Sequence, residues 1–255
     1  MLAAVCDGDA KKVAELMRQD PGFKVNMDQG YGVTLLHHAC GGDSSSPAIP
    51  VLLAHPGIDV NLKDIYGWTP FDYACWNGSA FSVREMLRDS RVMVNEPTKD
   101  GFTPLWYAAS HDHLDIIKWW IVSGREMDFG KPGDVDKTDA IGAAKKRGNS
   151  EVVTLLERFK ENPVETRHQV RVQLGLVDEL AAEVFAMVVF VSDGLLQING
   201  TTPSPAARFF SIASQLPLEL QMVLCYRQVG SAREIIPRNN RELAFRNLAI
   251  GIDLP

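Results

Sequence analysis

Two groups of histidines are the first residues in this sequence whose types and spacing could do chemistry. His37 stands beside His38, and His111 and His113 flank Asp112. Imidazole and carboxylate groups are zinc ligands, so a metal site is the first chemistry to weigh. The stretch GKPGD at 130–134 is a further candidate, but it lacks the spacing and the Ser or Thr of a phosphate-binding loop. We interpret it as a Pro/Gly loop.

Motifs that mark common enzyme classes are missing from the sequence. It has no nucleophile elbow, no paired-carboxylate motif and no cysteine cluster. Catalytic triads assemble from positions that are distant in the chain, but nothing in the order of these residues argues for one. We therefore expect a protein that is not an enzyme and that uses neither a cofactor nor a metal.

The elements that must position any functional residue occur as a repeat. Four threonines open similar segments at intervals of 35, 34 and 35 residues: Thr34, Thr69, Thr103 and Thr138. Each segment runs into a pair of small residues and then into an apolar pattern with helical spacing. A second phrase, KVN at 24–26, DVN at 59–61 and MVN at 93–95, closes successive units. Self-similarity at this period indicates a stacked array of supersecondary units.

One unit, residues 64–95, predicts two helices and a hairpin. Thr69 is placed to cap a first helix, and Pro70 fits its first turn because the missing N–H has no partner there. Gly78 is placed to end that helix. Phe81, Val83, Met86 and Leu87 form the apolar stripe of a second helix. An extended hairpin follows, with its turn near 99–101.

These residues resemble the ankyrin repeat, whose family phrase is Asp-x-x-Gly-x-Thr-Pro-Leu-His-x-Ala-Ala-x-x-Gly. The stretch 103–109, TPLWYAA, matches it well. Asp72 and Trp106 stand where the family usually has His, which predicts looser local hydrogen bonding without loss of the fold. The resemblance places His37 at the structural His position and His111–His113 at the turn between the helices. It thus favours a structural role for the histidines over a metal site.

The expected architecture is all-α. Residues 1–160 form an ankyrin-repeat solenoid of about five units, the outer two atypical, and residues 161–255 form an α-helical C-terminal domain. Every lysine lies at or before Lys160, which places a compositional boundary there. In the second domain we expect one long helix or two shorter ones within 162–198, and further helices within 206–215, 216–230 and 239–249.

Composition and charge narrow the partners and the compartment. The net charge is −6, so nucleic acid is not an expected partner. The longest apolar run, 184–191, is far shorter than the roughly 20 residues of a membrane span, so we expect no membrane partner. The start of the chain does not read as a secretory signal, and the four cysteines are interpreted as reduced. The expected location is cytoplasmic, with the nucleus left open.

The resemblance implies a function, which is to bind another protein. In ankyrin arrays the turn tips and the exposed side of the first helix of each unit form a concave face that holds the partner. Here these positions are Tyr31, Ile65, Tyr66, Trp68, Trp76, Asn77, Lys99, Asp100, Phe102, Ser110 and His111. Aromatic residues are enriched at binding hot spots. The alternative is that some of these rings pack on the adjacent hairpin or on the second domain.

A short stretch of the second region suggests a different class of function. Residues 216–220, LPLEL, are followed by Val223 and Leu224 and resemble the opening of the F-box. That resemblance implies a substrate adaptor that docks on the linker protein of cullin-RING ubiquitin ligases. Ordinary helical packing explains the same residues, as does a helical cap on the array. Exposure of Leu216, Leu220 and Leu224 as one apolar patch would favour the adaptor.

Overall fold

The structure is a computed structural model that describes residues 1–20, 22–130, 138–193, 205–229 and 235–251. Within these ranges it is all-α, as predicted, and contains no strand. The chain divides into two compact units, 1–167 and 168–255. We expected the division after residue 160; here it falls inside helix α11 (Pro163–Gln173). The GKPGD loop lies almost wholly outside the described residues.

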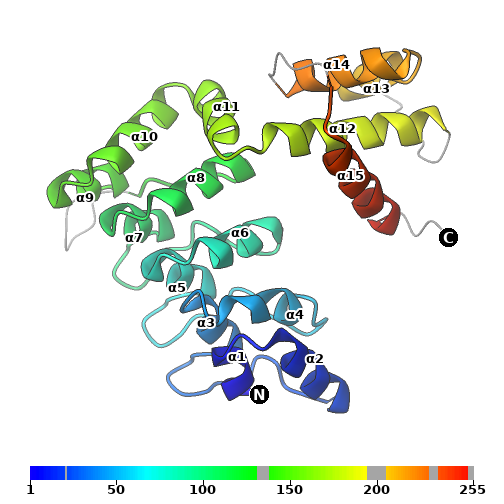
Figure 1. Ribbon diagram of the computed structural model, residues 1–255. Coiled ribbons are helices and arrows are strands. Elements are labelled where there is room, and N and C mark those ends of the chain that lie inside the picture. The colour runs from blue at the N-terminus through cyan, green and yellow to red at the C-terminus, as the bar shows by residue number, and fades with distance from the viewer. Residues whose placement is uncertain (21, 131–137, 194–204, 230–234, 252–255) are drawn as a thin grey trace. The chain divides into compact units, whose positions relative to one another are not determined.

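The first unit is an array of paired helices arranged in two layers (Figure 1). Helices α1, α3, α5, α7 and α9 form one layer, and α2, α4, α6, α8 and α10 form the other. Their bounds are α1 (Leu2–Cys6), α2 (Ala10–Gln19), α3 (Leu35–Cys40), α4 (Ile49–Leu53, preceded by the 3-10 helix η1, Ser46–Ala48), α5 (Pro70–Asn77), α6 (Ala80–Arg88), α7 (Pro104–Ser110), α8 (Leu114–Ser123), α9 (Ala140–Arg147) and α10 (Ser150–Glu161). Loops between the pairs project from the α1–α9 layer.

Two helices of the α1–α9 layer, α5 and α7, start with the Thr-Pro phrase, and α3 starts after Thr34 without a proline. Thr69 and Thr103 cap α5 and α7, and each hydroxyl accepts a hydrogen bond from the third residue of its helix. In the last pair the cap is Asp139, whose carboxylate accepts from the Gly142 N–H, and Thr138 precedes it. The fifth unit is therefore shifted by one residue from the threonine spacing.

A ladder of asparagines explains the repeated VN phrase. Asn61 Nδ2 donates to the carbonyl of Arg91 at 2.8 Å, and its Oδ1 accepts from the N–H of Met93 at 2.8 Å. Asn26 and Asn95 make the same pair of bonds to the units that follow them. Each VN asparagine thus joins one repeat to the next by two hydrogen bonds, while the preceding valine is buried.

Arginines close the ends of the outer helices in a second ladder. Arg91 donates to the carbonyl of Leu53 in the preceding repeat. Arg125, 34 residues later, donates to the carbonyls of Leu87, Asp89 and Val92. The carbonyls of Leu53 and Leu87 lie in the last turns of α4 and α6, where backbone acceptors lack intrahelical donors, so the guanidinium groups satisfy them. The carbonyls of Asp89 and Val92 belong to the loop that follows α6. Both ladders cross from one repeat to its neighbour.

The second unit is held by one apolar cluster around helix α12 (Val177–Ser192), not by a repeated motif. Helices α13 (Pro205–Ala213), α14 (Leu218–Gln228) and α15 (Arg238–Gly251) pack against it. Phe185 and Tyr226 are fully buried in the cluster. Of the two expectations for residues 162–198, the structure has two helices, α11 and α12.

Candidate functional site

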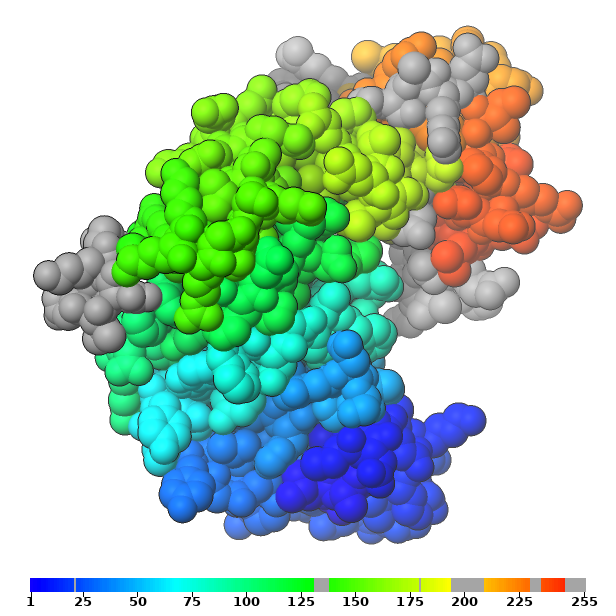
Figure 2. Space-filling model, turned by 60° about the vertical axis from the view of Figure 1, so that its left-hand side comes forward, coloured from blue at the N-terminus to red at the C-terminus, as the bar shows by residue number. Residues whose placement is uncertain are grey.

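Turn tips of successive repeats are joined into a continuous column. The carbonyl of Tyr31 accepts from the N–H of Ile65 at 2.9 Å, and the carbonyl of Tyr66 accepts from the N–H of Lys99 at 3.2 Å. Lys99 Nζ also donates to the carbonyl of Ile65. In Figure 2 the tips protrude one above another, from blue through cyan to green. The backbone thus places neighbouring tips in a fixed register.

Side chains at these tips face solvent. Tyr31 is 76% exposed and Tyr66 63% exposed, and Ile65, Lys99 and Asp100 are exposed as well. Tyr31 adopts φ 58°, a left-handed conformation that is uncommon outside glycine. The structure therefore places the five predicted tip residues where a partner could reach them.

The two tryptophans of the third repeat differ in their surroundings. Trp76, next to the last residue of α5, is 46% exposed. Trp68 is half-buried: its ring lies 4.5 Å from that of Tyr107 and edge-on to Tyr73, and it packs against the cluster formed by Trp106, Tyr107 and Ala143. Packing on the adjacent repeat, the alternative for these rings, describes Trp68, whereas Trp76 remains available for contact.

In the fourth repeat the predicted residues also separate. Phe102 is half-buried and stacks on Trp106 with ring centroids 4.1 Å apart. Ser110 is 2% exposed, and its hydroxyl lies 3.1 Å from the carbonyl of Tyr107 and 2.9 Å from His111 Nδ1. Our assignment of Ser110 to the contact surface is therefore corrected: its side chain is buried and contacts His111. His111 and the neighbouring α5 residue Asn77 keep exposed surface.

The residues at the family's His position show how each repeat closes its first turn. His37 Nδ1 accepts from the Thr34 N–H at 3.0 Å, so Nε2 carries the proton and donates to the carbonyl of Trp68 in the next repeat at 3.1 Å. Burial lowers the pKa of His37, which favours this neutral form. The histidine therefore has a structural role, as the resemblance implied.

Asp72 takes over half of that role. Its Oδ2 accepts from both the N–H and the hydroxyl of Thr69 at 2.8 Å, while Oδ1 is buried and finds no partner among the described residues. Burial raises the pKa of Asp72 to about 7. Trp106 Nε1 is likewise buried without a described partner. The expected loosening therefore occurs in the bond to the next repeat, while the cap at Thr69 is kept.

Comparison with known proteins identifies the repeat. Residues 1–96 match the family model for three copies of the ankyrin repeat, and residues 100–128 match the single-repeat model. The N-terminal region of this chain belongs to the ankyrin-repeat family. Ankyrin repeats are protein–protein interaction modules, and the family is typically non-catalytic.

A curated relative of much greater length matches part of this chain. An 80-residue segment is 32% identical to alpha-latrocrustotoxin-Lt1a of Latrodectus tredecimguttatus. The segment covers 31% of this chain and 5% of the toxin. The chain thus spans a small fraction of that relative's length.

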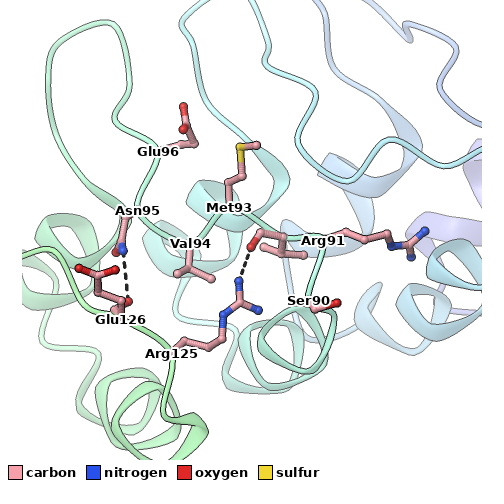
Figure 3. Close-up of a pocket in the computed structure, with 9 residues that line it drawn as sticks. Ser90, Arg91, Met93, Val94, Asn95, Glu96, Arg125 and Glu126 are labelled. Carbon is pink, nitrogen blue, oxygen red and sulfur yellow. Dashed lines mark hydrogen bonds between the residues drawn. The ribbon is translucent and has the colours of Figure 1, made fainter.

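The array also has a pocket of about 480 Å³ between the loops that end the third and fourth repeats (Figure 3). It is lined by Ser90, Arg91, Val92, Met93, Val94, Asn95, Glu96, Arg125 and Glu126. Figure 3 shows Arg125 turned toward the backbone of the preceding repeat and Asn95 bonded to Glu126. Arg91, Asn95 and Arg125 of its wall are thus engaged in the two ladders, and we assign the pocket to the joint between repeats.

Three residues that the sequence reasoning did not assign to the site contact its tryptophans and His111: Tyr73, Tyr107 and His113. His113 Nε2 bonds to the carbonyl of Trp76 at 3.0 Å, and its ring stacks on His111 with centroids 5.9 Å apart. The rings of Tyr73 and Tyr107 both contact the ring of Trp68. Burial raises the pKa of each phenol to about 12. The two tyrosines lie four residues after the capping residues Thr69 and Thr103, about one helical turn away. This repeated spacing was the sequence signal that could have identified them.

Neither a metal-ligand cluster nor a membrane-spanning helix occurs in the part of the chain that the structure describes. Within those ranges, no three His, Cys, Asp or Glu side chains lie together as metal ligands would. None of the described helices combines the length and the apolar character needed to cross a bilayer.

In the second unit, Leu220 is 51% exposed, whereas Leu216 and Leu224 are half-buried and Leu224 packs against the apolar cluster. The three leucines therefore do not form the common open patch that the adaptor hypothesis required.

Proposed function

We propose that this chain is a non-catalytic protein-binding module whose partner docks on the concave face of the array. This face comprises the tip residues Tyr31, Ile65, Tyr66, Lys99 and Asp100, together with Trp76, Asn77 and His111. Supporting it most directly is Trp76, an indole left 46% exposed between better packed rings. Exposed tryptophan surrounded by ordered neighbours is typical of binding hot spots.

Replacement of Trp76 by Ala tests the proposal. Binding proteins are first isolated by affinity pull-down with the full chain, and the recovered partner is then titrated calorimetrically against wild type and variant. We expect Trp76→Ala to weaken binding by about 2 kcal/mol, or roughly 30-fold, because hot-spot truncations have this size. Its melting temperature should change little, since surface substitutions usually cost about 0.5 kcal/mol or less.

Phe81→Ala is the matched control. Phe81 is 41% exposed but lies on α6, in the opposite helix layer. Unchanged affinity in Trp76→Ala, or an equal loss in Phe81→Ala, would show that the concave face is not the binding site. Trp68→Ala is unsuitable alone because its packing on Tyr107 makes a loss of stability the expected result.

A further inference from the structure

The C-terminal ends of α5, α7 and α9 form a second column on the array, apart from the turn tips. His113, the N-cap of α8, bonds to the carbonyl of Trp76 at the end of α5. Asn149, the N-cap of α10, donates to the carbonyls of Ala109 and Ser110 at the end of α7, at 2.8 and 3.1 Å. These side-chain bonds hold each helix end beside the next one.

Chemical character changes along this column. The end of α5 presents Trp76, whose ring lies edge-on to His111 at the end of α7, with centroids 6.1 Å apart. The end of α9 presents Lys145, Lys146 and Arg147, and all three are exposed. The column therefore runs from an aromatic surface to a cationic one, in a chain whose net charge is −6.

Helix stability alone does not account for the cations. Basic residues are favourable near a helix C-terminus because they interact with the helix dipole. The last turns of α5 and α7, both fully described, carry no basic residue. Both α5 and α9 end with a left-handed glycine, Gly78 and Gly148, so α9 has the same backbone cap as α5 and carries the cations in addition. Lys145 pairs with Glu157 at 2.6 Å. Three consecutive cations thus exceed what the neighbouring helices of the same layer use.

We infer that the partner contributes an extended segment with an aromatic or large apolar residue near one end and acidic residues near the other. The apolar residue would pack on Trp76 and His111, and the acidic residues would lie over the end of α9. Complementary charge selects the orientation of the segment and disfavours basic partners. This inference rests on the proposed function and adds the chemical class and direction of the ligand.

Geometry sets the spacing in that segment. From α5 to α9 there are two steps between packed helices, each about 8–10 Å, so the aromatic and cationic surfaces lie roughly 16–20 Å apart. An extended chain advances about 3.3–3.6 Å per residue. About five or six residues should therefore separate the aromatic residue from the acidic group.

Fluorescein-labelled peptides test the class and the spacing. Each carries one Trp, a Gly/Ser spacer and four Glu, and binding to the full chain is followed by anisotropy. We expect the five-residue spacer to bind at least 10-fold more tightly than a one-residue spacer or a peptide with four Lys in place of Glu. Equal binding of the Lys peptide, or no binding of the Glu peptide at millimolar concentration, would overturn the inference.

Charge reversal locates the contact. The double variant Lys146→Glu, Arg147→Glu should lose at least 10-fold in affinity for the Glu peptide and gain affinity for the Lys peptide. The neutral variant Lys146→Gln, Arg147→Gln should lose affinity for the Glu peptide without gaining affinity for the Lys peptide. Thermal melting checks that both double variants fold. If Trp76→Ala weakens partner binding but charge reversal does not, the acidic segment is wrong and the proposed function stands. If neither changes binding, both are wrong.

Discussion

The repeat array and the C-terminal unit are both helical, but different interactions hold them together. In the array, Asn26, Asn61 and Asn95 repeat the same two bonds from one unit to the next. In the C-terminal unit, one apolar cluster on α12 gathers the helices. The hydroxyl of Tyr226 lies 2.9 Å from Asp178 Oδ1 and 3.1 Å from the carbonyl of Ile235, a contact made once.

The difference explains where sequence reasoning succeeds. In the array, stability is distributed over similar interfaces between neighbours, so each interface leaves its own copy of the signal in the sequence. In a unit with a single core, any apolar residue of suitable size can fill a site, so the sequence predicts helices without predicting what they do.

We expect the largest loss of stability from a substitution in the apolar core of the C-terminal unit. Phe185 is 1% exposed and lies in the α12 cluster, so Phe185→Ala should destabilise the C-terminal unit by about 3–5 kcal/mol through lost burial and a cavity. Hydrogen exchange should then rise in α12–α15 while α3–α8 stay protected. Ile212→Ala, at a position that is 61% exposed, is the control. Equal loss of protection in the array would show that the two units unfold together.

A smaller loss should follow from cutting one rung of the asparagine ladder. Asn61→Ala removes two hydrogen bonds to the next repeat, and we expect a cost of about 2 kcal/mol in chemical denaturation. Asn77→Ala is matched to it, because Asn77 Nδ2 bonds only within its own helix, to the carbonyl of Tyr73. The ladder would have no special role if both variants had the same midpoint.

Acidity at Asp72 should give the array a distinctive pH dependence. Its pKa is about 7 in the folded protein against an ordinary value of 3.8, so the folded state binds the proton more tightly than the unfolded state. The associated stability is present below pH 4, falls as pH rises to about 7, and is lost above that. The slope is at most about 1.4 kcal/mol per pH unit.

Asp72→Asn should remove that slope, since its amide cannot titrate and its oxygen can still accept from the Thr69 N–H. Unfolding midpoints measured from pH 4.5 to 8 decide the matter. Parallel curves for wild type and variant would mean that Asp72 titrates as an ordinary carboxyl.

We expect the smallest effect to be a difference in stability between alanine substitutions at two glycines of the turn tips. Gly101 has φ 81°, and an added Cβ would meet no other atom within 4 Å, so Gly101→Ala should cost only about 1 kcal/mol of backbone strain. Gly67 has φ 82°, but an added Cβ would lie 2.9 Å from the Lys99 backbone N. Gly67→Ala should cost more because it separates adjoining tips. Equal denaturant midpoints would show that contact between tips adds nothing.

Much of the array follows from the sequence, and the exceptions have physical causes. Thr-Pro pairs correctly predicted the starts of α5 and α7, because capping is a local interaction. The start of α9 was misplaced by one residue, since Thr138 and Asp139 can both cap a helix. Burial of Ser110 and packing of Trp68 depend on the neighbouring repeat, which the sequence of one repeat does not contain. The role of Asp72 was predicted in part: its place at the family's His position indicated looser hydrogen bonding, but not that its carboxylate would keep the bond from the Thr69 N–H.

Rotational freedom at Trp76 is already restricted before any partner arrives. Its carbonyl is bound by His113, and its ring meets Trp68 and His111 edge-on. Gly78 keeps this arrangement possible, since a side chain there would lie 2.6 Å from the His113 ring. Ordering a mobile side chain on association costs about 0.5–1.5 kcal/mol. The Trp76 side chain is already ordered in the folded protein, so less side-chain entropy is lost when a partner binds to it.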